Sequence, residues 1–375
     1  MRLLDRYVLM KFFIPFIYCF VGFLSIWLVF DLSDNGPDFI EAHTPLKKIV
    51  EYYQTQIPEI IVISLPIGEL LALLYALTQM SRSNEIVSML TAGVSVGRII
   101  VPLVLVGMLL TGITQYFNYE MSPHAAAEKK QMLREIKRGK KIEPGLTGHL
   151  FRNRENFRTW YMRKIHNGKL KQYLEDVQVI QQDANGNITD QLYAREAYFN
   201  PTSRVWTFFF VKYVKLDDKG EMLQPEYSRK MDVSNWSETP WRIASSVMNP
   251  DYLSVDELKL YLTYNSDFPK KRLAPYETQL YYRWALPWVC LLAIFLAAPL
   301  GIVYSRRGIL GGVASAIALF FSLVFISSLF VTLGKGDKIN PFVAAWGPMV
   351  VYFAIGLTLT WMKSTNRELP KIPGI

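Results

Sequence analysis

The sequence lacks the signatures of common ATPases and zinc peptidases. Its 375 residues contain no G-x-x-x-x-G-K-[ST] phosphate loop and no H-E-x-x-H, so we do not expect the chain to hydrolyse ATP itself. Histidine is rare, and the few present are scattered without the spacing of metal ligands. These histidines are His43, His124, His149 and His166. The sequence therefore predicts no enzymatic activity, no metal site and no cofactor in this chain.

Cysteine is equally scarce. Cys19 and Cys290 are the only two, and both lie within apolar runs, so they offer neither a disulfide framework nor a metal site. Acidic residues are outnumbered by basic ones, which gives a formal net charge of +9. Because the basic residues cluster beside apolar runs, membrane topology explains this excess more simply than nucleic-acid binding does. We expect no nucleic-acid partner.

Long apolar runs are what the sequence has in abundance. Hydrophobic residues make up 51% of the chain, and this mean value combines a membrane-like half with a polar half. Each run has roughly the 20 residues needed to cross a bilayer. The predicted spans are Phe12–Phe30, Ile57–Met80, Ile99–Phe117, Trp284–Tyr304, Ile309–Leu333 and Phe342–Met362. The first is too long for a signal peptide and lacks a small-residue cleavage site, so we expect it to be retained.

The spans divide the chain into three parts. Residues 1–120 carry the first three transmembrane helices, residues 121–280 form a polar insert with flanking helices, and residues 281–375 carry the last three helices and a tail. With the N-terminus in the cytoplasm, most basic residues of the short loops fall on the cytoplasmic side. These are Arg2, Arg6, Lys11, Arg82, Arg98, Arg306, Arg307, Lys363, Arg367 and Lys371, against Lys47, Lys48, Lys335 and Lys338 on the opposite side. Both termini are thus predicted inside and the insert outside.

Within the insert, residues 149–236 change to a period of two. Runs rich in aromatic and β-branched residues alternate with turn signals, which predicts an antiparallel β-sandwich or open barrel. The runs are Phe157–Ile165, Tyr173–Gln182, Gln191–Phe199 and Arg204–Leu216. After them, Ser254-Val-Asp-Glu257 has the form of a capping box, so a short helix should lead the chain back to the bilayer.

The polar stretch Ser81–Arg98 separates the second and third spans. Ile86, Leu90 and Val94 recur in it at helical spacing. Ser83 or Asn84 could cap the start of such a helix and Gly93 could end it. These residues alone predict a short helix at the membrane surface, and a mere connector is the alternative.

One carboxylate, Glu69, falls near the middle of the second span. A charged side chain at that depth costs on the order of 3 kcal/mol even on lenient scales, so it should face protein or a wet cavity. Two interpretations of Glu69 remain open. Glu69 either lines a transport cavity or is a protonated or partnered residue between helices.

A resemblance gives the polar stretch a function. The segment Arg82-Ser-Asn-Glu85-Ile-Val-Ser-Met-Leu-Thr-Ala92-Gly93-Val-Ser95 resembles the loop after the second span in the LptF/LptG (YjgP/YjgQ) permease family, whose pattern is R-x-x-E-[IL]-x-x-[ML]-x-A-x-G. Thr91 and Ala92 stand where the family varies among small residues. The opening Leu4-Asp5-Arg6-Tyr7 and the order of spans and insert are also similar. The resemblance implies an α-helical membrane protein with six transmembrane helices and an antiparallel β-jellyroll-like periplasmic domain inserted between helices 3 and 4.

The resemblance also implies a function and partners. The chain would be a permease subunit of an ABC-type exporter that extracts lipopolysaccharide from the bacterial inner membrane and passes it to a periplasmic bridge. Its partners would be an LptB-like ATPase dimer, a second LptF/LptG-type permease, and LptC- and LptA-like periplasmic proteins. The resembling segment would be the coupling helix that docks into the ATPase, through Arg82, Asn84, Glu85, Ile86, Met89, Ala92 and Gly93.

By the same resemblance, spans one and five form lateral gates around an outward-opening cavity. Candidate acyl-chain contacts are aromatic residues of these spans, namely Trp27, Phe30, Phe320, Phe321 and Phe325, with Glu69 as a further cavity candidate. The alternative is that most of the aromatic residues simply face lipid. Some family members carry lysines near the outer end of span one, where this chain has Asp31, Asp34 and Asp38. Phosphate recognition at span one is therefore not expected here.

Two other functional classes make different predictions. A membrane-anchored β-sandwich that binds or scaffolds without transporting would form no stable complex with an ATPase. A membrane-embedded enzyme acting on lipid would need several ionisable residues at one depth, and Glu69 alone is placed deeply. The exporter subunit is the leading hypothesis.

Overall fold

The computed structural model describes residues 3–138, 145–167, 172–217, 220–245, 248–266, 268–302 and 309–365. Several predicted cytoplasmic basic positions, namely Arg2, Arg306, Arg307, Arg367 and Lys371, lie outside this part of the chain. The chain divides into two compact units. A helical unit comprises Met1–Gly139, Pro250–Lys259 and Lys270–Ile375, and a β unit comprises Lys140–Asn249 and Leu260–Pro269.

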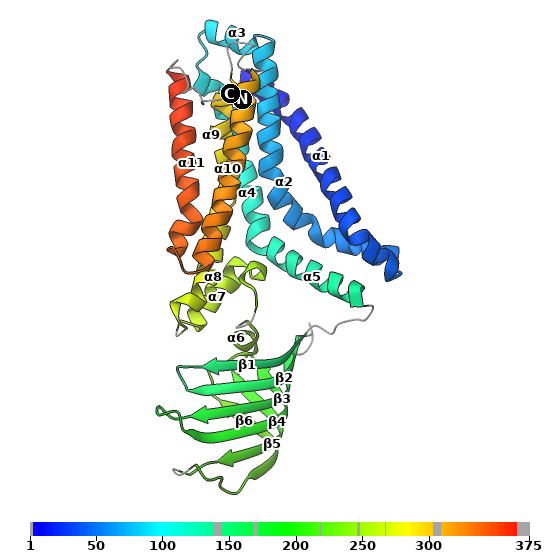
Figure 1. Cartoon of the computed structure of the whole chain (residues 1–375), viewed down its shortest axis with the longest axis vertical. Coiled ribbons are helices and arrows are strands. Elements are labelled where there is room, and N and C mark those ends of the chain that lie inside the picture. The colour runs from blue at the N-terminus through cyan, green and yellow to red at the C-terminus, as the bar shows by residue number, and fades with distance from the viewer. Residues whose placement is uncertain are drawn as a thin grey trace. The chain divides into compact units, whose positions relative to one another are not determined.

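The helical unit is a bundle around α9 (Figure 1). Its elements are α1 (Leu3–Glu41), α2 (Leu46–Arg82), α3 (Glu85–Thr91), α4 (Val96–Tyr116), a π-helical turn η1 (Phe117–Met121), α5 (Ser122–Arg138), a 3-10 turn η2 (Pro250–Tyr252), α8 (Lys270–Ala285), α9 (Trp288–Gly301), α10 (Ile309–Lys335) and α11 (Pro341–Ser364). Almost every residue of α9 is buried, because the helix is apolar on all sides and contacts α2, α4, α10 and α11.

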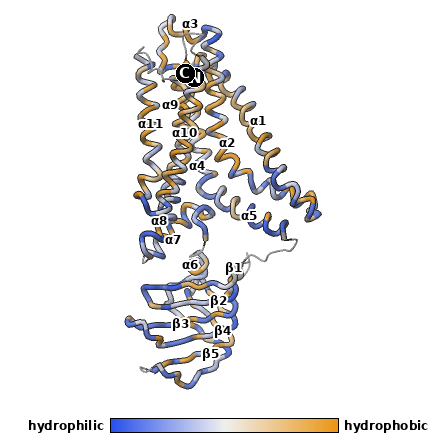
Figure 2. Tube along the Cα trace, in the orientation of Figure 1, coloured by the Kyte–Doolittle hydropathy of each residue, from blue (hydrophilic) through white to orange (hydrophobic). Residues whose placement is uncertain are grey.

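Five helical stretches of the described chain are long and apolar enough to cross a membrane. They are Leu3–Glu41, Leu46–Arg82, Val96–Lys137, Gly311–Lys335 and Pro341–Ser364, and the bent pair of α8 and α9 supplies a sixth. Apolar residues run along these helices, whereas α5 is largely polar (Figure 2). The predicted helical membrane class is confirmed.

Two features of the helices differ from the prediction. Residues 31–56, which lie between the first two predicted spans, are almost wholly helical, so α1 and α2 extend well past the apolar runs. The fourth span begins at Lys270 rather than Trp284 and bends by 52° before Trp288. Pro287 stands at the bend, where it lacks an N–H group and disfavours helical geometry in the residue before it.

The β unit is built on one antiparallel sheet of six strands in chain order, which fits the predicted jellyroll-like domain. The strands are β1 (Gly145–Asn153), β2 (Arg158–Asn167), β3 (Gln172–Gln182), β4 (Ile188–Asn200), β5 (Val205–Lys215) and β6 (Glu226–Ser234). The four predicted runs correspond to β2 through β5. Trp160, Trp206 and Phe208 on β2 and β5 are fully buried and pack against one another.

Short helices follow the sheet. The α6 helix (Pro240–Ser245) lies near β1, where His149 Nε2 is 2.9 Å from the Ile243 carbonyl oxygen. His149 is therefore satisfied by backbone. The predicted capping box is confirmed at the start of α7 (Val255–Tyr264): Ser254 N donates to Glu257 Oε2 at 2.8 Å, and Glu257 N donates to Ser254 Oγ at 3.2 Å.

Candidate functional site

The predicted surface helix is α3, and it is fixed at both ends by its backbone. Asn84 precedes it in the left-handed region, with φ of 59°, and its side chain does not cap the helix. The prediction that the Ser83 or Asn84 side chain caps the start of α3 was therefore wrong. Ser83 Oγ instead donates to the Gln79 carbonyl oxygen and to the Glu85 carboxylate. The helix stop at Gly93 is confirmed: φ is 86°, and the bonds Gly93 N to Leu90 O and Val94 N to Met89 O form a Schellman motif.

The apolar face of α3 packs inward. Ile86 is fully buried in the main core of the helical unit, and Met89, Leu90 and Val94 pack against that core. Two of the predicted coupling residues, Ile86 and Met89, thus hold α3 in place. Because this face is buried, the residues on the opposite face of α3 are the ones that remain exposed.

The opposite face of α3 is exposed. It carries the other predicted coupling residues Arg82, Asn84, Ala92 and Gly93, together with Ser88 and Thr91. Ser95 follows within Gly93-x-Ser95-x-Gly97, whose letters match a hydrolase nucleophile elbow. That elbow joins a strand to a helix, whereas Ser95 joins two helices and its Oγ accepts a hydrogen bond from Arg98 N. The exposed face is polar and can receive another protein, but it carries no catalytic arrangement.

Glu85 belongs to neither face. Its carboxylate is half-buried and turned toward the start of α1. Tyr7 Oη donates to Glu85 Oε2 at 2.9 Å, and Lys11 Nζ lies 3.5 Å from Glu85 Oε1. Ser83 Oγ is 3.0 Å from the same Oε1. Beside this cluster, Arg98 Nη2 lies 3.0 and 3.1 Å from the two carboxylate oxygens of Asp5.

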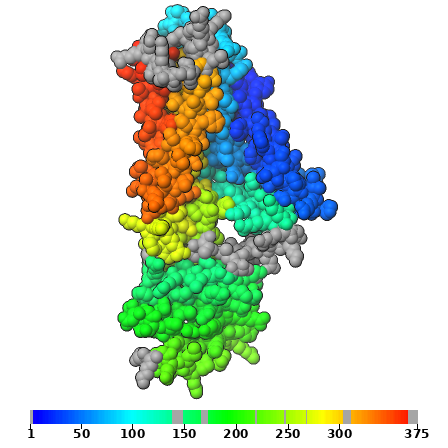
Figure 3. Space-filling model, viewed as in Figure 1, coloured from blue at the N-terminus to red at the C-terminus, as the bar shows by residue number. Residues whose placement is uncertain are grey.

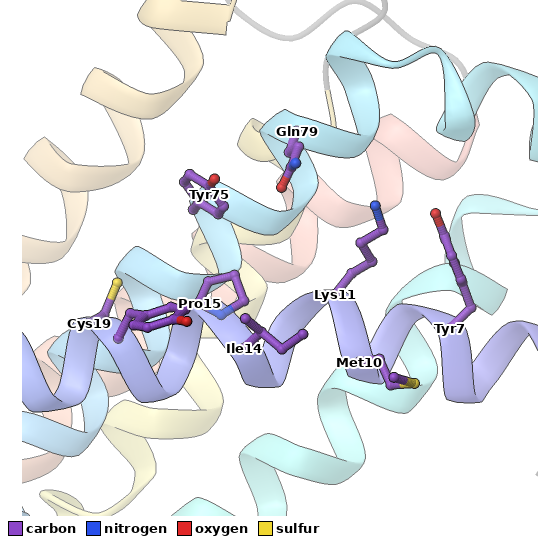
Figure 4. A pocket seen from close by; sticks show the side chains of 9 residues that line it. Tyr7, Met10, Lys11, Ile14, Pro15, Cys19, Tyr75 and Gln79 are labelled. Carbon is purple, nitrogen blue, oxygen red and sulfur yellow. The ribbon is translucent and has the colours of Figure 1, made fainter.

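A groove of about 670 Å³ lies between the N-terminal part of α1 and the C-terminal part of α2. It is lined by Tyr7, Met10, Lys11, Ile14, Pro15, Tyr18, Cys19, Tyr75 and Gln79. Tyr7 and Lys11 project from the same side of α1 (Figure 4). A second groove of about 480 Å³ continues past Tyr75 and Gln79 to Val313 and Ile317 of α10. The helices α1, α2 and α10 share one face of the helical unit (Figure 3).

The aromatic gate candidates fall into two groups. Phe30 on α1 is 72% exposed, and Phe321 and Phe325 on α10 are 54% and 65% exposed, so these rings are open to a lipid or a partner. Phe320 is instead buried in the core. Trp27 is half-buried, because its ring packs edge-on against Tyr53 and beneath the Lys129 ammonium group.

Glu69 lies among packed helices. It is fully buried on α2, beside the Cys290 thiol of α9. Gly107 of α4 leaves room for it, since a Cβ atom there would come within 3.2 Å of Glu69 Oε1. Its surroundings are those of a residue between helices rather than of a residue exposed to an aqueous cavity.

Two acidic residues in the C-terminal part of α1, Asp31 and Asp38, pair with lysines of α5. Lys129 Nζ lies 3.6 Å from Asp31 Oδ1, and Lys137 Nζ lies 3.0 Å from Asp38 Oδ2. Tyr52 of α2 also donates to Asp31 Oδ1, at 3.3 Å. Sequence reasoning noted the acids but missed the two lysine partners, because these lysines lie about a hundred residues away in the chain.

The described residues contain no group of three or more His, Cys, Asp or Glu side chains that could hold a metal ion. The arrangement offers instead an exposed short helix, two connected grooves and exposed aromatic rings on apolar helices. A search of curated proteins finds no match to the chain. The family described as "Lipopolysaccharide export system permease LptF/LptG" matches residues 6–362. This match covers nearly the whole chain, and we conclude that the chain belongs to the LptF/LptG family of lipopolysaccharide export permeases.

Proposed function

We propose that this permease is driven by a separate ATPase that docks on the exposed face of α3. The observation that carries the proposal is the geometry of α3. Ile86 anchors the helix in the core, the αL residue Asn84 and the Schellman motif at Gly93 fix its two ends, and a polar face remains outside. A helix held in this way passes an applied force to α2 and α4 instead of unwinding.

The end of the bundle that carries α3 is proposed to face the cytoplasm, where an ATPase operates. The first turns of α1 contact α3 directly, and α11 ends at the same end of the bundle (Figure 1). The excess of basic residues at this end supports the orientation, because cytoplasmic loops are enriched in Lys and Arg. The β unit would then lie in the periplasm and pass lipopolysaccharide to LptC- and LptA-like proteins.

The lipid is proposed to contact the exposed aromatic rings of α1 and α10. Phe30, Phe321 and Phe325 supply large apolar surfaces suited to acyl chains. A second LptF/LptG-type permease would complete the cavity. Because Lys129 and Lys137 are already paired with Asp31 and Asp38, and Asp34 adds a further carboxylate, the outer end of α1 is not expected to bind a lipid phosphate strongly. Head-group phosphates would be held elsewhere, for example by the second permease.

Co-purification tests this function. The tagged full chain, extracted in mild detergent, is expected to bring down a nucleotide-binding subunit, a second six-span permease and bound lipopolysaccharide, all identified by mass spectrometry. An unrelated six-span permease, tagged and extracted in the same way, is the control. Recovery of the chain without a nucleotide-binding subunit would instead support the membrane-anchored scaffold.

A further inference from the structure

The α1 helix is attached to the rest of the helical unit mainly near its ends. Its buried residues are Val8 and Phe12 at the inner end and Asn35 and Phe39 at the outer end. Only 11% of its most apolar stretch is buried, against 72% for α2. Between the ends, α1 and α2 approach closely where a Cβ atom on Gly68 would lie 3.7 Å from the Phe20 backbone, and the Trp27 ring packs against Tyr53.

The inner attachment is polar and involves both sides of α3. Tyr7 and Lys11 contact Glu85, the first residue of α3. Asp5 pairs with Arg98, which lies in the first turn of α4 just after α3. We name the contacts of Asp5, Tyr7 and Lys11 with Glu85 and Arg98 the inner latch. Through it, α1 is joined to both ends of the segment that contains α3.

We propose that the inner latch transmits movement of α3 to α1, with Asp5 and Tyr7 as positioning residues for lipid export. This proposal rests on the proposed function, in which α3 is the element that the ATPase moves. The α1 helix runs from Leu3 to Glu41 with Pro15 between the latch and Phe30. In this proposal, a displacement of its inner end is carried past Pro15 to the part that holds Phe30. The Glu85 carboxylate is thereby assigned to an intramolecular contact as well as to the coupling segment.

The strength of the latch follows from its geometry. The Arg98–Asp5 pair combines short N–O distances with a carboxylate that is only 16% exposed, and charge-assisted hydrogen bonds of this kind are stronger than neutral ones. The Tyr7–Glu85 bond is likewise a hydrogen bond to a carboxylate. The Lys11–Glu85 pair at 3.5 Å is longer and partly exposed, so it contributes less.

The contact is tested first in the purified full chain, which needs no partner. Tyr7→Phe removes the phenolic hydroxyl and is expected to speed amide hydrogen exchange in residues 3–14 by about fivefold, as the loss of one hydrogen bond would. The matched control is Tyr116→Phe, since Tyr116 is an exposed residue at the end of α4 and lines neither groove. Unchanged exchange in Tyr7→Phe would show that the latch does not hold α1, whatever the function of the chain.

Transmission is tested in the complete exporter reconstituted in vesicles, by measuring lipopolysaccharide released per ATP hydrolysed. Asp5→Arg is expected to leave ATP hydrolysis within about twofold of wild type and to lower release per ATP by at least about fivefold, the lower end of typical coupling between sites. Combining it with Arg98→Asp restores the pair with its charges exchanged and should recover release per ATP.

Two results would overturn the proposal: unchanged release per ATP in Asp5→Arg, or no recovery in the exchanged pair. Should Asp5→Arg not assemble, Tyr7→Phe decides, because it changes no charge and should lower release per ATP while Tyr116→Phe does not. A failure of the proposed function looks different, since the wild-type chain would then assemble no ATPase and show no ATP-dependent release.

Discussion

Glu85→Lys is expected to abolish lipopolysaccharide export while the chain remains inserted in the membrane. The carboxylate accepts a hydrogen bond from Tyr7 and pairs with Lys11 at 3.5 Å, so reversal of its charge places two ammonium groups together and removes the acceptor. The same change alters the segment on which the ATPase is proposed to dock. Export is measured by complementation in cells depleted of the wild-type protein, and insertion by membrane fractionation.

The control for this charge reversal is Asp256→Lys. The Asp256 side chain is 94% exposed on α7, and its pair with Lys259 is long, so its loss should have little effect on export. Full complementation by Glu85→Lys would remove Glu85 from both the coupling segment and the inner latch.

Gly356→Leu is expected to cause a large loss of stability in the helical unit. A Cβ atom at Gly356 would lie 2.9 Å from Phe295 Cβ, 3.1 Å from the Phe295 carbonyl carbon and 3.2 Å from its oxygen. Two of these atoms are backbone, so α9 and α11 must separate, and overpacking of this kind costs about 1–3 kcal/mol. The apparent Tm in detergent should fall on the order of 5 °C.

Gly112→Leu on α4 is the matched control, because nothing lies within 4 Å of the Cβ atom at that position. Its apparent Tm should stay close to that of the wild type. Equal behaviour of the two variants would contradict the close packing of α11 on α9.

Features set by local sequence could be predicted, because their physical causes lie within a few residues. The apolar runs marked the membrane helices, since a bilayer requires a minimum length. The alternation in residues 149–236 indicated strands, and Ser254 with Glu257 gave a correct capping box. The stop at Gly93 followed from the freedom of glycine at positive φ.

Features set by distant partners could not be predicted from the sequence. The helical extension of α1 past the apolar run is stabilised by Lys129 and Lys137, and nothing local pairs them with Asp31 and Asp38. The contact of Tyr7 with Glu85 joins residues 78 positions apart. In the same way, the aromatic residues of span five looked equivalent in sequence, whereas Phe320 is buried and Phe321 and Phe325 are exposed.

The central claim is that the exposed face of α3 receives a separate ATPase, and site-specific photo-cross-linking tests it most directly. The full chain carrying benzoylphenylalanine in place of Thr91, an exposed residue of α3, is irradiated in intact cells, with Asn185 in an exposed turn of the β unit as the comparison site. If the ATPase docks on α3, we expect an adduct with a nucleotide-binding subunit from position 91 and none from position 185. An adduct with that subunit from position 185, or none from position 91 while the chain still supports export, would contradict it.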